Sequence, residues 1–245
     1  MRPAAAFDLP RGVVVPVRDI KLSLLPGDHP FAERNREAAR ANWQQEIAAK
    51  PALFDGRITL FASMHIADGV LSGTCHMTDY SSFLHWRRMR GAREGEHAYA
   101  HAVIIAGNGN LLAARMGEHT ANAGRVYFAA GSFEPEDIHE GRIDVEANMA
   151  REVVEETGLS LAAMRPEAGY HIYSVESGTV LIRRYYSDWT AERLAEAVRE
   201  HVASQADPEI DGPVILSPGS GPNEDFADHM NAIVDWHFGQ HRINL

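Results

Sequence analysis

The segment that decides the fold is Arg151-Glu152-Val153-Val154-Glu155-Glu156-Thr157-Gly158-Leu159. A helix turns by about 100° per residue, so Glu152, Glu155 and Glu156 would lie on one face of a helix formed here. Asp144 suits the N-cap of such a helix, and Gly158 suits the left-handed position just after its end. The spacing predicts a helix over residues 145–157 that gathers three carboxylates on one side.

Carboxylates that share one helix face repel one another. Glu152 and Glu156 are like charges four residues apart, and their position near the C-terminal end of the helix opposes its dipole. A hard divalent cation would reverse this balance, because Mg²⁺ prefers oxygen ligands. The spacing alone leaves two interpretations open: a metal site, and a solvated face on which Arg151 pairs with Glu155.

This segment resembles the second half of the Nudix signature, which reads Arg-Glu-apolar-x-Glu-Glu-x-Gly-apolar. Every fixed position of that half is met, by Arg151, Glu152, Val153, Glu155, Glu156, Gly158 and Leu159. The resemblance covers roughly residues 98–216. It favours the metal site over the solvated face.

The first half of the signature is not met in the same way. It expects a glycine, five residues, a glutamate and then seven residues before the arginine, and counting back from Arg151 places Ile143 at the glutamate. Counting forward from Gly131 gives Asp137 instead. We prefer the second alignment, because the segment 130–136 resembles the Pro-Gly-Gly-x-x-Glu-Pro loop of the family. Asp137 or Glu136 would then stand in for the first glutamate.

The Nudix resemblance implies a chemistry and a set of site residues. Mg²⁺ (or Mn²⁺) would be held by Glu152, Glu155 and Glu156, which we assign as both the catalytic and the metal-binding residues. Of these, Glu152 and Glu156 are expected to be direct ligands. An activated water would attack one phosphorus of a nucleoside-diphosphate-linked compound, for which a nucleotide sugar is a candidate. We assign Arg115 and Gly131 to substrate binding.

The general base stays open in this interpretation, with Glu134, Glu136 and Glu176 as candidates. Two other classes of function also stay open. One is a catalytically inactive Nudix domain that acts as a nucleotide-ligand sensor, although the metal glutamates are all retained here. The other is an interaction module in which the Glu-rich helix is purely structural.

For the fold we predict the α/β class. Residues 96–245 are expected to form a Nudix-type α/β/α sandwich with a mixed sheet, and residues 1–95 a small α+β leader domain, with a polar linker at 90–96. The expected helices span residues 31–50, 82–89, 145–157, 191–204 and 224–238. The expected strands span residues 13–17, 58–66, 70–77, 98–106, 110–115, 126–130, 170–176, 179–186 and 214–216.

The leader segment carries a weaker resemblance of its own. Residues 50–56 and 78–86 are similar to the leader domain of Nudix enzymes that hydrolyse UDP-glucose. These short motifs are equally compatible with turn and packing residues. They make UDP-glucose one candidate among the nucleotide sugars.

Composition limits the partners. The formal net charge is −11, from 34 acidic against 23 basic residues, so long-range electrostatics repel nucleic acid and we do not expect it as a partner. No apolar run approaches the roughly 20 residues that cross a bilayer. The single cysteine, Cys75, fits a reducing cytoplasm, where we place the protein. His97 and His101 lie too far apart on a strand to bind zinc together. A small-molecule substrate is expected, and a homodimer is left open.

Overall fold

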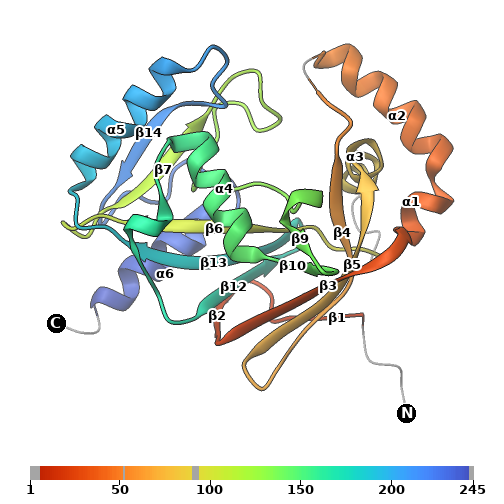
Figure 1. Cartoon of the computed structure of the whole chain (residues 1–245), viewed down its shortest axis with the longest axis horizontal. Helices are drawn as coiled ribbons and strands as arrows, with labels where there is room; N and C mark the ends of the chain where they lie inside the picture. The colour runs from red at the N-terminus through yellow and green to blue at the C-terminus, as the bar shows by residue number, and fades with distance from the viewer. Residues whose placement is uncertain (1–5, 52, 90–93, 243–245) are drawn as a thin grey trace.

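The computed structural model describes residues 6–51, 53–89 and 94–242, which fold into two mixed β-sheets and their helices (Figure 1). The strands are β1 (Phe7–Asp8), β2 (Val14–Val17), β3 (Asp19–Asp28), β4 (Arg57–Ala67), β5 (Val70–Asp79), β6 (Ala98–Ile105), β7 (Leu111–Met116), β8 (Val126–Tyr127), β9 (Ile138–His139), β10 (Arg142–Ile143), β11 (Arg165–Pro166), β12 (Tyr170–Val175), β13 (Gly178–Tyr186) and β14 (Ile210–Leu216). The α-helices are α1 (Pro30–Arg34), α2 (Arg36–Ala49), α3 (Tyr80–Arg88), α4 (Val145–Thr157), α5 (Ala191–Ser204) and α6 (Met230–Arg242).

The larger sheet carries the site helix. Its strand order is β14-β7-β6-β13-β12-β2, with β8 paired to β7 and β11 to β13, and the β6–β13 pair is parallel whereas the others are antiparallel. Helix α4 contacts β6, α5 contacts β14 and β7, and α6 contacts β2. In Figure 1, α4 lies in front of this sheet and α6 behind it. The predicted α/β class, a mixed sheet flanked by helices, is confirmed.

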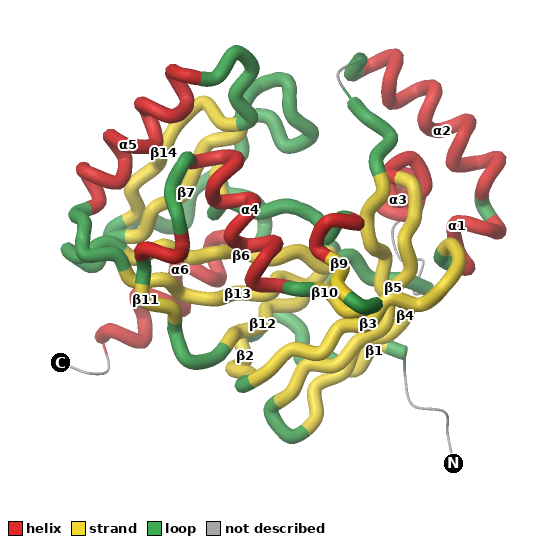
Figure 2. The backbone as a smooth tube through the Cα atoms, in the orientation of Figure 1, coloured by secondary structure: helices red, strands yellow, loops and turns green. Residues whose placement is uncertain are grey.

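The smaller sheet has the strand order β1-β4-β5-β3-β10-β9. Figure 2 shows α1, α2 and α3 gathered beside β4 and β5, apart from α4 and α5. The chain crosses between the two sheets more than once. The N-terminal strand β2 pairs with β12 of the larger sheet, and the later strand β10 pairs with β3 of the smaller sheet. The boundary near residue 95 stays a prediction. Residues 90–93 of the expected linker lie outside the described residues.

Helix α4 forms as its local sequence predicts. The Asp144 side chain accepts a hydrogen bond from the Ala147 backbone at 2.9 Å, and Gly158 ends the helix with φ of 70°. A Cβ on Gly158 would also lie 2.6 Å from the His201 ring of α5, so two constraints require glycine there. Met149 and Val153 are fully buried and fix the apolar face of the helix against the sheet.

Several predicted boundaries were wrong. The expected helix 31–50 is two helices, because the Asn35 side chain bonds the Phe31 carbonyl (2.9 Å) and interrupts the helix. Strand β3 was not predicted. The last helix begins at Met230 rather than 224, since the preceding loop pairs with β8 through the Val126 amide and the Asp225 carbonyl (2.9 Å). The predicted strand 126–130 ends at Tyr127, and the predicted strand 214–216 begins earlier, at Ile210.

Other predicted elements agree with the structure to within a few residues. The hairpin turn at Asp68 and Gly69 is confirmed, with φ of 50° and 71° respectively. The hairpin of β12 and β13 and the helix α5 are confirmed as well. Among the helices that the structure describes, none is long and apolar enough to cross a membrane.

Candidate active site

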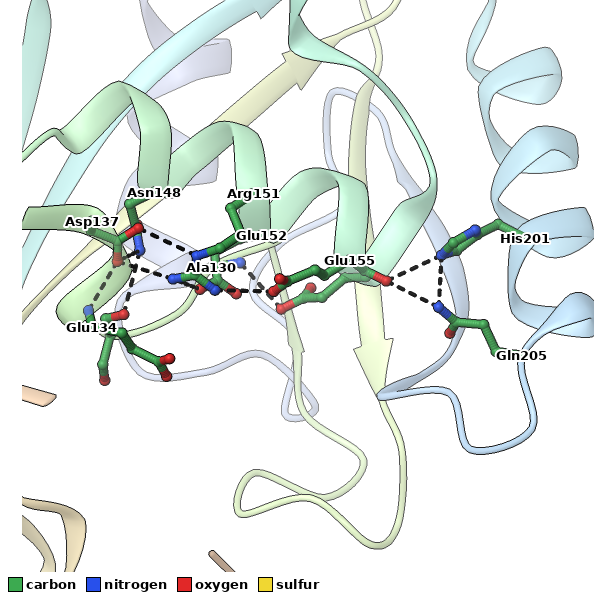
Figure 3. Close-up of polar contacts among 11 residues, drawn as sticks. Ala130, Glu134, Asp137, Asn148, Arg151, Glu152, Glu155, His201 and Gln205 are labelled. Carbon is green, nitrogen blue, oxygen red and sulfur yellow. Dashed lines mark hydrogen bonds and ion pairs between the residues drawn. The ribbon is translucent and has the colours of Figure 1, made fainter. Parts of the chain in front are cut away.

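Helix α4 presents its three glutamates in two different environments. Figure 3 shows Glu152 and Glu155 together with Arg151 of the same helix. Glu152 and Glu156 are 7% and 2% exposed. The Glu155 side chain is 54% exposed and pairs with Arg151 Nη1 at 3.0 Å. The structure therefore brings two of the predicted carboxylates into a buried site and leaves the third at its rim. At the end of the helix, Gln205 donates to the Glu155 carbonyl (3.2 Å), which ties α5 to α4.

The loop before α4 packs directly on the two buried carboxylates. The Ala130 amide lies 3.4 Å from Glu156 Oε1 and donates to it. A Cβ on Gly131 would overlap the Glu152 carboxylate and lie 2.6 Å from its Oε2. Gly131 is thus required for space rather than for an unusual backbone angle. The sequence assigned Gly131 to the substrate, and in the fold its immediate neighbour is the Glu152 carboxylate.

Burial disfavours charge on both carboxylates. It raises the pKa of Glu152 to about 8, although the guanidinium of Arg151, 2.8 Å from Glu152 Oε1, acts in the opposite direction. The pKa of Glu156 is raised well above its usual range, first by burial and next by the charge of Glu152. Among the residues that the structure describes, Glu156 Oε2 has no hydrogen-bond partner. The pair is stable together only with a proton or a cation between them.

These residues fit a hard divalent cation. Within the described ranges, no three His, Cys, Asp or Glu side chains are arranged as a complete metal site. Glu152 and Glu156 nevertheless supply adjacent carboxylate oxygens, one of them unpartnered, and Glu155 is one residue away at the rim. Mg²⁺ commonly binds one or two protein carboxylates and completes its shell with water and substrate phosphates. A partial protein shell of this kind is therefore adequate for Mg²⁺ or Mn²⁺.

Asp137 anchors the arginine of the motif. Its side chain is 1% exposed and accepts hydrogen bonds from the Glu134 amide (2.9 Å), Asn148 Nδ2 (2.9 Å) and Arg151 Nη2 (3.0 Å). Arg151 in turn contacts Glu152 and Glu155. Asp137 thus holds the guanidinium of Arg151, which contacts the glutamates. Glu136, in contrast, is exposed. The equivalence of Asp137 to the first glutamate of the signature stays a prediction.

Replacing Asp137 with Asn is expected to lower the free energy of unfolding by about 2–4 kcal/mol, because Arg151 loses its buried counter-charge. Urea unfolding followed by circular dichroism measures the change. Asp211→Asn, a substitution at an exposed aspartate of β14, is the matched control and should unfold like the wild type. Equal stability of the two variants would show that the buried ion pair contributes nothing.

The other predicted residues lie in different places. Arg115 donates to the Gly124 carbonyl and to Asp225 Oδ2, both at 2.9 Å, and its role toward phosphate stays a prediction. Glu134 is half-buried, and burial raises its pKa, against the opposing effect of Arg151. Glu176 is exposed in the turn between β12 and β13. An unpredicted carboxylate, Glu209, lies close enough to raise the pKa of Glu156.

A cavity of about 340 Å³ opens beside the Ala130–Gly131 loop. It is lined by Arg87, His97, Tyr99, Asn122, Arg125, Tyr127, Ala130, Gly131, Ser132, Ser177, Ala227, Asp228 and His229. Sequence analysis missed most of these residues, which come from α3, β6, β8 and the loops before β8 and α6. One signal was present: His97, Tyr99 and His101 alternate along the predicted strand, so all three face one side.

Comparison with known proteins gives distant structural similarity. No protein-family profile matches the chain, and no curated protein matches it. A MutT protein from Methanosarcina mazei has a TM-score of 0.40 and 19% identity over 60% of this chain and 95% of its own. An Ap4A hydrolase from C. elegans has a TM-score of 0.40 and 12% identity, over 60% and 99% respectively.

A third similar structure is a bifunctional NMN adenylyltransferase/ADP ribose pyrophosphatase from Francisella tularensis, complexed with AMP and a Mn ion. Its TM-score is 0.39 at 14% identity, over 59% of this chain and 42% of its own. Similarity this distant assigns no activity to the chain, so a function has to be inferred from the site's own residues.

Proposed function

We propose that this chain is a Nudix-type hydrolase that cleaves a pyrophosphate bond in a nucleoside-diphosphate-linked compound with the help of Mg²⁺ or Mn²⁺. One observation carries the proposal: Glu152 and Glu156 are both buried one turn apart on α4, and Glu156 Oε2 has no hydrogen-bond partner in the described part of the chain. A purely structural helix would gain stability by losing one of these charges. Both carboxylates pack against the Ala130–Gly131 loop, which lines a cavity, and this placement supports a cation-dependent function.

Each charged residue between Arg151 and Glu156 of α4 then has a role. Glu152 and Glu156 hold the cation, and Glu155 at the rim is a further ligand or orients a water. When bound, the cation neutralises phosphate oxygens and lowers the pKa of a water. Arg151 keeps Glu152 in place through its contact at 2.8 Å, and Asp137 keeps Arg151 in place. The general base stays open among Glu134, Glu136, Glu176 and the newly located Glu209.

The cavity supports a substrate larger than pyrophosphate alone. Its volume of about 340 Å³ accommodates a nucleoside or a sugar beside the cation site, and Arg87 and Arg125 bring positive charge to its lining. We propose a nucleotide sugar, UDP-glucose among others, as one candidate class. We further propose a cytoplasmic location without a nucleic-acid partner, consistent with the net charge of −11.

A hydrolysis screen tests the proposal. The purified protein is stripped of metal with a chelator and incubated with nucleotide sugars, dinucleoside polyphosphates and dinucleotides, with and without added Mg²⁺ or Mn²⁺. We expect a nucleoside monophosphate product that appears only with the cation. Glu200→Gln, at an exposed position of α5, is the control for loss of a helix carboxylate and should retain activity. Tight ligand binding without turnover under either metal would favour a sensor instead.

A further inference from the structure

A chain of hydrogen bonds runs behind the cavity. His101 Nδ1 lies 2.9 Å from the Phe128 carbonyl oxygen, and His101 Nε2 lies 2.9 Å from His229 Nε2. His229 Nδ1 lies 3.0 Å from the Tyr99 hydroxyl. His101 is fully buried and His229 is 8% exposed, whereas Tyr99 lines the cavity. The chain therefore connects a buried carbonyl to the hydroxyl of a residue that lines the cavity.

The direction of every bond in this chain follows from its buried end. A carbonyl oxygen only accepts, so His101 carries its proton on Nδ1 and its Nε2 accepts. His229 must then donate from Nε2, which leaves its Nδ1 as an acceptor. The Tyr99 hydroxyl consequently donates its proton to His229. What remains at Tyr99 Oη is lone pairs, so this oxygen offers the cavity a hydrogen-bond acceptor and no donor.

This order requires both imidazoles to be neutral, and their surroundings keep them so. Burial lowers the pKa of His229 to about 4, with Asp228 as the opposing charge. Burial and the neighbouring His229 lower the pKa of His101 well below its usual value. At neutral pH neither imidazole ring carries a second proton, which would reverse the direction of the hydrogen bonds.

Two arginines line the same cavity as Tyr99. Arg87 of α3 lines the same cavity. Burial lowers the pKa of His97, and the charge of Arg87 adds to that effect, whereas burial raises the pKa of Tyr99 and Arg87 opposes it. Arg87 forms no ion pair within the part of the chain that the structure describes, so its charge is not neutralised by a carboxylate there. Arg125 is held by the carbonyls of Glu224 (2.8 Å) and Phe226 (3.2 Å). The cavity thus places the Tyr99 acceptor in a lining that also holds two arginines and the carboxylate of Asp228.

We propose that this cavity selects a nucleobase of the lactam type, uracil or guanine, whose ring N–H donates to Tyr99 Oη while the adjacent carbonyl oxygen faces Arg87. The inference rests on the proposed function and names the base of its substrate. Adenine and cytosine present an unprotonated ring nitrogen at the corresponding edge, and its lone pair would face those of Tyr99. The aromatic rings of Tyr127 and His97 line the cavity and suit a flat ligand.

Binding of nucleoside monophosphates tests this without any turnover. Calorimetry on the whole protein with Mg²⁺ would compare UMP and GMP with CMP and AMP, and then with 3-methyl-UMP and 1-methyl-GMP, which lack the ring N–H. We expect UMP or GMP, or both, to bind at least about tenfold more tightly than CMP and AMP. For a nucleotide that binds, methylation of the ring nitrogen should weaken the affinity by at least about tenfold relative to the unmethylated nucleotide. The two methylated ligands tell a uracil site from a guanine site.

Tyr99→Phe separates a hydrogen bond from a steric effect. In that variant, methylation should cost less than about threefold, because the acceptor is gone. Tyr127→Phe is the matched control: its hydroxyl accepts from Asn122 at 3.3 Å in the same cavity, and the full methylation penalty should persist there. Circular dichroism checks that each variant is folded.

Three results would overturn the inference: equal binding of all four bases, no binding of any of them, or a methylation penalty unchanged in Tyr99→Phe. The wild-type comparison alone decides the matter if Tyr99→Phe does not fold. Because hydrolysis is measured separately, pyrophosphate cleavage without base selection would leave the proposed function standing. Base selection without cleavage would overturn the proposed function and leave the base site intact.

Discussion

Replacing Glu156 with Gln is expected to lower the rate of pyrophosphate hydrolysis roughly a thousandfold. Glu156 is 2% exposed, and its Oε2 has no hydrogen-bond partner within the described ranges, so this oxygen is free to bind the proposed cation. Gln keeps the shape and the contact with the Ala130 amide, but it removes the charge that attracts a divalent cation. Turnover of the best substrate from the screen, at saturating Mg²⁺, measures the effect.

Thermal unfolding of the same variant gives a readout that does not depend on substrate. Without metal at neutral pH, Glu156→Gln should be more stable than the wild type. Burial raises the pKa of Glu156, so folding forces this carboxyl group to take up a proton, and Gln removes that cost. Added Mg²⁺ should stabilise the wild type, by about 2.7 kcal/mol at a hundred times its Kd, and leave the variant unchanged. Glu200→Gln should behave as the wild type in both assays. Turnover in Glu156→Gln equal to that of the wild type would remove the proposed function.

Replacing Gly131 with Ala is expected to abolish most activity, by roughly a hundredfold or more, while the protein stays folded. The new Cβ would occupy the place of the Glu152 carboxylate, which is the flexible end of a side chain and can move away. Moving it separates Glu152 from Arg151 and from Glu156, so a cation loses one of its two buried ligands. Initial rates across a Mg²⁺ titration should show both a lower maximum and a weaker apparent affinity for the metal.

Gly239→Ala is the control for Gly131→Ala, because a Cβ at Gly239 of α6 would meet no described atom within 4 Å outside the nearby backbone of its own helix. We expect wild-type rates for it. A Gly131→Ala protein that unfolds at the wild-type temperature yet has lost its response to Mg²⁺ would support the proposed packing. Full activity in Gly131→Ala would mean that Glu152 does not need its place against the loop, and would contradict the assignment of this glutamate as a ligand.

The sequence by itself determined the helix that carries the site. Its N-cap Asp144, its terminating Gly158 and its apolar positions are all set within a few residues, since helix geometry is local. The same locality placed three glutamates on one side. The mixed α/β class followed from strands and helices that mix without the regular alternation of a doubly wound sheet. Even the predicted hairpins agree with the structure, because their turn residues lie next to the strands they join.

Only the tertiary structure decided which glutamates are buried. Glu152 and Glu156 face the loop at residues 130–131, whereas Glu155, one residue away, faces solvent, and no local rule distinguishes them. The cavity likewise unites Arg87, Tyr99 and His229, which are far apart along the chain. The acceptor character of Tyr99 depends on a carbonyl at Phe128 that it never touches. Burial, packing and the direction of hydrogen bonds arise from non-local contacts, so they appear only when the strands and helices come together.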